Sequence, residues 1–176
     1  MKIFLVAGKS GSGKNEVAKI IHEFYIYKLQ KCVVTEFSKY LKTFAKELTD
    51  WDGVSDNKPR DFLQKFGSRI RVYDKFYFTK RMVDDIKIYD SYGIQNVIIS
   101  DTRMPIEIEE IRNNFDDVIV IYVVNQFGKS NLTLKQQQDI SEVALEDYQD
   151  FDYVIANDDK EELKNKVFKI LEEIEK

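Results

Sequence analysis

The residues best suited to chemistry lie near the amino terminus, in the sequence GKSGSGK at positions 8–14. This sequence fits the pattern G-x-x-x-x-G-K, in which backbone N–H groups surround phosphate oxygens and the lysine reaches the terminal phosphates. Three of the seven glycines lie between positions 8 and 13, where a Cβ would collide with the turning backbone or the approaching phosphates. The motif predicts nucleotide binding by Gly8, Lys9, Ser10, Gly11, Ser12, Gly13 and Lys14.

Two polar residues are the candidates for holding Mg²⁺. Asn15 follows the motif where Ser or Thr is expected, and its amide oxygen can still ligate or orient the ion, directly or through water. Asp101 follows the apolar run 96–100, and ligands of open parallel sheets bind beyond the carboxyl ends of the strands. Asp101 is therefore expected to hold Mg²⁺ through water or to orient an acceptor. A plain turn aspartate before Pro105 is the alternative explanation.

Arg103 is expected to point into the same ligand region as Asp101. A guanidinium can bind a phosphate through two hydrogen bonds, and a surface salt bridge is the ordinary alternative. Lys14, Arg103 and Asp101 are the candidate catalytic residues. If these residues transfer a phosphoryl group to an acceptor that is itself a phosphate monoester, the acceptor is already ionised at neutral pH. Such an acceptor needs no strong general base. Catalysis would then consist of positioning and of neutralising charge on the transferred group.

Alternating short strands and helices are expected to position these residues. Apolar runs predict strands at 2–7, 32–37, 96–100, 117–124 and 151–156. Helical patterns and capping signals predict helices at 14–29, from 38 to about 48, from 59, from 73 or 74 to 92, at 105–114 and at 158–176. The alternation predicts one α/β domain, residues 1–176, with a parallel sheet covered on both faces. The polar stretch 125–138 shows no clear periodicity and is predicted to be a mobile loop.

Composition excludes several classes of protein. The chain has 27 Lys and Arg against 31 Asp and Glu, a net charge of −4, so no basic excess favours nucleic acid. The single cysteine, Cys32, excludes an internal disulfide and fits a reducing compartment. No apolar run approaches the ~20 residues of a membrane span, so no membrane partner and a cytoplasmic location are expected.

Among phosphate-loop proteins, the chain best fits a small-molecule kinase. A GTPase would need a guanine-reading N-K-x-D sequence, which is absent. A motor or helicase usually has a longer chain, an arginine finger and a surface for nucleic acid. The length of 176 residues, the acidic balance and the late polar stretch all favour a kinase that acts on a small acceptor.

Several later segments, in the same order, resemble the deoxynucleoside monophosphate kinases and the animal-type phosphomevalonate kinases. SDTRMP at 100–105 resembles their D-x-R stretch, and FSKYLK at 37–42 is similar to F-A-D-P-L-K. RDFLQKFGSRIR at 60–71 is similar to R-x-x-L-Q-x-x-G-T-x-x-R. ISE at 140–142 and FDYVIAN at 151–157 resemble the late S-E and D-x-V-I-x-N elements. The resemblance extends over residues 3–175 and rests on the shared order of the motifs.

The resemblance implies a three-layer α/β/α P-loop kinase fold with a five-stranded parallel sheet and a lid at about 125–138. ATP and Mg²⁺ would be the cofactors, and a small phosphorylated molecule would be the acceptor. The resemblance further implies acceptor phosphate binding by Lys42, Arg71 and Arg103, acceptor contacts by Gln64 and Glu142, and adenine proximity for Asn157. Each of these residues also has an ordinary structural explanation, such as a solvated helix lysine or a turn asparagine.

Two departures from the family pattern bear on activity. Asp139 replaces the histidine of the late H-x-S-E element, and the stretch 125–138 has lysines but no arginine. Charge neutralisation would then fall to Lys14, Lys9, Arg103 and Arg112, with Lys135 as a substitute in the lid.

The expected reaction is transfer of the γ-phosphoryl group of MgATP to a (deoxy)nucleoside monophosphate. A phosphomevalonate- or dephospho-coenzyme-A-type kinase is the alternative acceptor class. An ATP-binding module without efficient transfer is the alternative of a different class, motivated by Asn15 and the arginine-free lid. The oligomeric state is left open, with a homodimer as one option.

Overall fold

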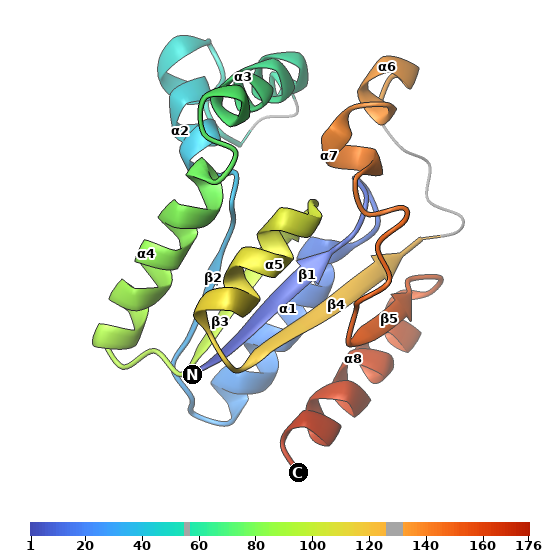
Figure 1. Cartoon of the computed structure of the whole chain (residues 1–176). Helices are drawn as coiled ribbons and strands as arrows, with labels where there is room; N and C mark the ends of the chain where they lie inside the picture. The colour runs from blue at the N-terminus through green and yellow to red at the C-terminus, as the bar shows by residue number, and fades with distance from the viewer. Residues whose placement is uncertain (55–56, 126–131) are drawn as a thin grey trace.

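Five parallel strands form the centre of the computed structural model, which describes residues 1–54, 57–125 and 132–176 (Figure 1). They are β1 (Lys2–Ala7), β2 (Cys32–Thr35), β3 (Asn96–Thr102), β4 (Val118–Val124) and β5 (Tyr153–Ala156). Their order across the sheet is β2-β3-β1-β4-β5, and all four neighbouring pairs are parallel. The five predicted strands are confirmed, and so is the predicted five-stranded parallel sheet.

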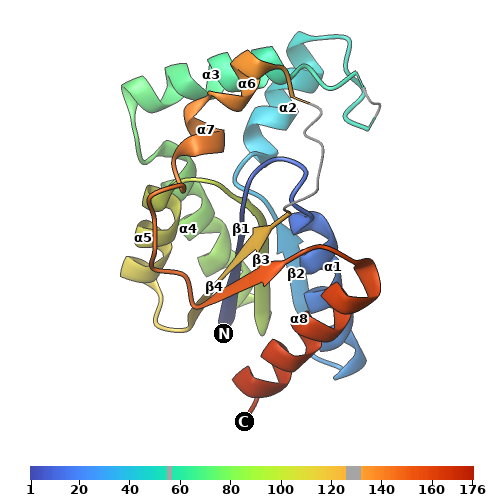
Figure 2. The same cartoon turned by 90° about the vertical axis from the view of Figure 1, so that its right-hand side faces the viewer.

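Helices cover both faces of this sheet because side chains of the central strand alternate between two apolar layers. Phe4 and Val6 of β1 pack in the core beneath α1 (Lys14–Tyr27) and α8 (Lys160–Ile174). Ile3 and Leu5 pack in the opposite core, beneath α4 (Tyr77–Ser91) and α5 (Pro105–Asn114). Figure 2 shows the sheet between these helical layers. The predicted three-layer α/β/α fold is therefore confirmed.

Four further helices lie beyond the carboxyl ends of the strands, at the top of Figures 1 and 2. α2 (Lys39–Leu48) and α3 (Arg60–Tyr73) form one group, and α6 (Leu134–Gln137) and α7 (Ile140–Val143) form the other. These two groups enclose the region in which open α/β sheets bind their ligands. Within the described residues, no helix combines the length and the apolar character that a membrane crossing requires.

The prediction of an irregular loop at 125–138 is wrong for residues 134–137, which form α6. Thr133 caps this helix: its Oγ1 accepts the Gln136 N–H at 3.3 Å, and its own N–H donates to Gln136 Oε1 at 3.1 Å. The segment LKQQ is short and mostly polar, so no apolar periodicity reveals it. The part of the predicted loop at 126–131 lies outside the described residues.

Several strand and helix ends differ from the sequence-based boundaries, those of β2, β3 and α4 among them. β2 ends at Thr35 instead of continuing to 37, and β3 continues to Thr102 instead of ending at 100. Asp101 is therefore the second-last residue of β3 and does not follow the strand. α3 extends to Tyr73, so α4 begins at Tyr77, later than the predicted 73 or 74.

Candidate active site

The phosphate loop connects β1 to the first turn of α1, and its conformation needs glycine. Gly8 and Gly13 have φ angles of 144° and 101°, which side-chain-bearing residues rarely adopt. A Cβ on Gly8 would lie 2.5 Å from the Val123 carbonyl oxygen, and a Cβ on Gly13 would lie 2.1 Å from Asn157 Nδ2. Within the described part of the chain, the buried Ser12 hydroxyl has no hydrogen-bond partner. A glycine cradle with an unpartnered polar atom fits the predicted phosphate ligand.

Lys14 is the buried cation of this loop. Its Nζ donates to the carbonyl oxygens of Gly8, at 2.7 Å, and of Lys9, at 2.6 Å. Burial lowers the pKa of Lys14 to about 7, and the nearby Arg103 guanidinium lowers it too, whereas Glu142 and Asp101 raise it. The negative charge of phosphate oxygens bound at the loop would favour the protonated form of Lys14.

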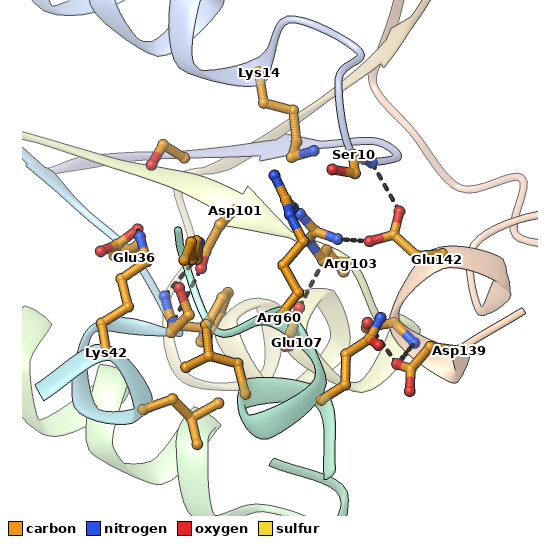
Figure 3. Close-up of a pocket in the computed structure, with 18 of the residues that line it drawn as sticks. Ser10, Lys14, Glu36, Lys42, Arg60, Asp101, Arg103, Glu107, Asp139 and Glu142 are labelled. Carbon is orange, nitrogen blue, oxygen red and sulfur yellow. Dashed lines mark hydrogen bonds and ion pairs between the residues drawn. The ribbon is translucent and has the colours of Figure 1, made fainter. Parts of the chain in front are cut away.

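A cavity of about 460 Å³ lies beside the loop and contains most of the predicted site (Figure 3). Its walls come from the phosphate loop, the ends of β2 and β3, helices α2 and α3, and the α7 region. The structure brings together in this cavity the predicted residues Ser10, Gly11, Gly13, Lys14, Asn15, Lys42, Gln64, Arg71, Asp101, Arg103 and Glu142.

Asp101 fixes the junction between two elements at the floor of this cavity. Its Oδ1 accepts the Phe37 N–H at 2.7 Å, and its Oδ2 accepts the Ser38 N–H at 3.0 Å. Asp101 thus ties the end of β3 to the segment between β2 and α2. This role was not apparent from the sequence, because Phe37 and Asp101 are 64 positions apart.

The donor set suits a magnesium ion held mainly by its substrate. No group of three or more His, Cys, Asp or Glu side chains suited to a metal occurs within 1–54, 57–125 and 132–176. Mg²⁺ usually keeps several waters and binds one or two carboxylates together with substrate phosphates. Asp101 and the exposed Asn15 line the same cavity as the phosphate loop, so both fit this mode of binding.

Arg103 and Glu142 join the phosphate loop to α7. The Arg103 guanidinium forms an ion pair with Glu142 Oε1, and Glu142 Oε2 accepts the Ser10 N–H at 2.8 Å (Figure 3). The Glu142 side chain is only 6% exposed. The structure thus places Glu142 against the phosphate loop, and it places the predicted phosphate-binding arginine against Glu142.

Glu107 is a buried carboxylate to which the sequence assigned no role at the site. Its Oε2 accepts the backbone N–H groups of Arg103, at 2.8 Å, and of Met104, at 3.1 Å. Burial raises the pKa of Glu107 to about 7; the Arg103 amide lowers it, Asp101 raises it, and Arg71 and the Met104 amide lower it. Its position three residues after the N-cap of α5 is the signal that could have identified it.

Cations gather on the side of the cavity formed by α2 and α3. Lys42 forms an ion pair with Glu36, and the Arg71 guanidinium lies 5.1 Å from the Phe78 ring centroid. Lys58 and Arg60 also line the cavity, although neither was predicted to be a site residue. The pKa of Lys58 is lowered to about 8, chiefly by burial and also by Lys42, Arg60 and Arg103, against the opposing effect of Glu36. The crowding of positive charge favours an anionic ligand here.

The side chain of Gln64, which was predicted to contact the acceptor, is hydrogen-bonded within the protein. Its Nε2 donates to the Gln136 carbonyl oxygen at 3.2 Å, and Gln136 Nε2 donates to Asp61 Oδ1 at 2.6 Å. These bonds join α3 to α6.

The cavity lining does not include the other candidates, Gly8, Lys9, Ser12, Arg112, Lys135 and Asn157. Asn157 supports the phosphate loop from behind, because its Nδ2 donates to the Ser12 carbonyl oxygen at 2.9 Å. The Lys9 side chain pairs with Glu146 at the surface. Arg112 pairs with Asp150 and Asp152, so the structure gives it no part in the cavity.

Comparisons with known proteins agree with this architecture. The sequence model of the family described as deoxynucleotide monophosphate kinase matches residues 30–167, more than half of the chain. This match begins after the phosphate loop, so the loop and the family match are separate observations. None of the curated proteins that were compared matches the chain.

Solved structures share the fold at low sequence identity. An unliganded sugar kinase from Janibacter sp. HTCC2649 is 12% identical, with a TM-score of 0.60, over 98% of this chain and 95% of that chain. An uncharacterized protein from Eubacterium ventriosum ATCC 27560 is 13% identical, with a TM-score of 0.50, over 98% and 99% of the two chains.

Proposed function

Because the chain belongs to the deoxynucleotide monophosphate kinase family, we propose that this kinase-like phosphotransferase uses ATP and Mg²⁺ to phosphorylate a (deoxy)nucleoside monophosphate. The observation that carries the proposal is the single cavity shared by the phosphate loop and the cations of α2 and α3. A volume of about 460 Å³ suits a small molecule and not a nucleic-acid strand. The two ends of the cavity would hold the donor and the acceptor.

The proposed reaction needs little more than positioning. An oxygen of the acceptor monophosphate attacks the γ-phosphorus of ATP, the bond from that phosphorus to the β–γ bridging oxygen breaks, and ADP leaves. The acceptor oxygen is already ionised, so no side chain has to remove a proton. Lys14 and Arg103 would neutralise charge on the transferred group. Bound Mg²⁺, held through water by Asn15 and Asp101, would add to that neutralisation.

The acceptor would bind at the α2–α3 side of the cavity. Lys42, Arg71 and Arg103 were assigned to its phosphate by resemblance, and Lys58 and Arg60 lie beside them in the lining. Positive charge there suits a dianionic phosphate, which a guanidinium can bind through two hydrogen bonds. The adenine of ATP would lie near Asn157, which contacts the phosphate loop from the side away from the cavity.

The deciding experiment measures ADP formation from MgATP with a panel of acceptors. We expect turnover that depends on a deoxynucleoside monophosphate and exceeds turnover with phosphomevalonate or dephospho-coenzyme A. Turnover with one of the latter two acceptors alone would replace the proposed acceptor class. Tight ATP binding with no acceptor-dependent turnover would instead identify an ATP-binding module.

Substituting Lys14→Ala should lower the rate of transfer by about 10²–10³-fold, because it removes a preorganised cation from the transferred phosphoryl group. Lys19→Ala is the matched control on the same helix, where the lysine is exposed and pairs with Glu23. We expect wild-type kinetics for this control and wild-type circular dichroism for both variants. Full activity in a folded Lys14→Ala protein would contradict the proposed mechanism.

A further inference from the structure

Glu142 makes two contacts that a nucleotide phosphate is expected to make. One oxygen accepts the Ser10 N–H at 2.8 Å, a donor of the phosphate loop. The other oxygen pairs with the guanidinium of Arg103, the arginine proposed to bind phosphate. Figure 3 shows one dashed line from this carboxylate to Ser10 and another to Arg103. A carboxylate and a phosphate are both oxyanions, and both accept hydrogen bonds from an N–H group and a guanidinium. The hydrogen bonds that these two donors make to Glu142 are not available to a phosphate at the same time.

We propose that Glu142 competes with the phosphates of the nucleotide for the phosphate loop and Arg103, and so sets the affinity of the site for nucleotide. Nucleotide binding displaces the Glu142 carboxylate, which frees the loop donor and the arginine in one event. The inference rests on the proposed function only in that the phosphate loop binds a nucleotide. It replaces the acceptor contact that the sequence resemblance implied for Glu142.

Local structure holds Glu142 at this position. Asp139 caps the start of α7, since its Oδ1 accepts the Ser141 N–H at 3.0 Å and the Ser141 hydroxyl at 2.7 Å. Glu146 pairs with Lys9, so a second contact ties the same segment to the loop at the surface. The two glutamates differ in exposure: the Glu142 side chain is 6% exposed and the Glu146 side chain 50%. A buried anion against a phosphate-binding donor matters more than an exposed pair that water screens.

Charge supplies the direction of the effect. Glu142 places a negative charge where the nucleotide brings several more, and it occupies two donors that the nucleotide needs. Removing the charge without shortening the side chain should therefore strengthen nucleotide binding. An ordinary binding contact predicts the opposite result, because truncating a contact weakens the ligand that it touches.

The test uses the full chain and the non-hydrolysable analogue AMPPNP with Mg²⁺, titrated by calorimetry at constant ionic strength. We expect Glu142→Gln to lower the Kd about tenfold, which corresponds to about 1.4 kcal/mol. Glu146→Gln, which removes the same charge from the exposed pair with Lys9, should change the Kd less than about twofold. Thermal melting of each variant checks that it is folded.

A second variant keeps the test decisive if Glu142→Gln does not fold. Glu142→Asp retains the charge but withdraws the carboxylate from Ser10 by one methylene, so it should also tighten AMPPNP binding. An unchanged or weaker affinity in a folded variant would overturn the proposal, and so would absence of AMPPNP binding by every variant. A raised KM for the acceptor with unchanged AMPPNP affinity would restore the acceptor-contact role.

These outcomes separate the inference from the proposed reaction. The binding measurement needs neither acceptor nor transfer. Tighter AMPPNP binding without any turnover would support competition by Glu142 and refute the proposed kinase activity. Turnover with unchanged affinities would do the reverse.

Discussion

At the scale of single residues, two buried carboxylates position Arg103. Glu107 binds its backbone N–H and Glu142 binds its guanidinium. A buried carboxylate is stable only where donors satisfy it, and here the donors are the groups that the site uses. The arginine identified from its D-x-R spacing therefore works within a network that the spacing does not reveal.

Glu107 should make the stability of the protein depend on pH. Its pKa is raised from 4.5 to about 7, so the folded protein binds this proton more tightly than the unfolded chain. The stabilisation is fully present below the unfolded pKa and is lost as pH rises toward the folded pKa. Glu107→Gln keeps an oxygen that can accept both N–H bonds and removes the titration. Between about pH 5 and about pH 8, the free energy of unfolding should shift in favour of the variant by roughly 2–3 kcal/mol.

Urea denaturation of wild-type and Glu107→Gln protein over this pH range measures the difference. A gap between the two proteins that is constant with pH would show that the Glu107 proton does not take part in folding. Other ionisable groups of the protein also contribute to the wild-type curve, so that curve alone does not report on Glu107. The difference between the two curves isolates the one group.

At the scale of elements, the phosphate loop is supported by the end of β5 as well as by the strand and helix that it connects. Asn157, directly after β5, binds the Ser12 carbonyl oxygen and leaves no room for a Cβ on Gly13. The loop conformation thus depends on an element at the other end of the chain. This contact accounts for a glycine that the phosphate-loop pattern requires but does not explain.

Gly13→Ala should therefore destabilise the protein more than Gly11→Ala. Both glycines have positive φ, 101° and 78°, so both variants carry backbone strain of ~1–2 kcal/mol. Only at Gly13 does the new Cβ meet a neighbour, Asn157 Nδ2, whereas nothing lies within 4 Å at Gly11. We expect an additional loss of about 1–2 kcal/mol at Gly13, measured by urea denaturation.

A double-mutant cycle with Asn157→Ala assigns that additional loss to the contact. With the asparagine shortened, Gly13→Ala should cost no more than Gly11→Ala does. A coupling between positions 13 and 157 below about 0.5 kcal/mol would mean that the steric explanation is incorrect.

At the scale of the whole molecule, Arg112 joins the α5 layer to the segment that enters β5. Its guanidinium pairs with Asp150 and Asp152, and Asp152 Oδ2 also accepts the Val120 N–H of β4 at 2.7 Å. The contact secures the β5 edge of the sheet, on which Asn157 and the phosphate loop depend. Arg112 was predicted to be one of the cations that neutralise phosphate, and the structure gives it this structural contact instead.

Arg112→Ala should lower the free energy of unfolding by about 1 kcal/mol, because the pair is partly exposed and water screens it. We expect kcat and KM of phosphoryl transfer to match those of the wild type at a temperature where both proteins are folded. A large fall in kcat at unchanged stability would return Arg112 to the reaction.

The sequence by itself determined the alternation of strands and helices and the position of the phosphate loop. Strands buried on both faces of a parallel sheet appear as continuous apolar runs, and the loop motif occupies consecutive residues. The helix α6 was not predicted, because a helix of four residues is too short to show an apolar periodicity. The boundaries of β2 and β3 shifted by two residues because strand ends depend on partners across the sheet.

Only the tertiary structure decided which charges meet at the site. Ser10 and Glu142 are 132 positions apart, and Arg103 and Glu142 are 39 apart, so no spacing in the chain predicts either contact. The resemblance identified Glu142 as a site residue, but the folded chain places it on the phosphate loop. The packing of distant elements also brings Lys58, Arg60 and Glu107 into the cavity lining. Local pattern determines an element, whereas packing of distant elements determines the partner of a buried charge.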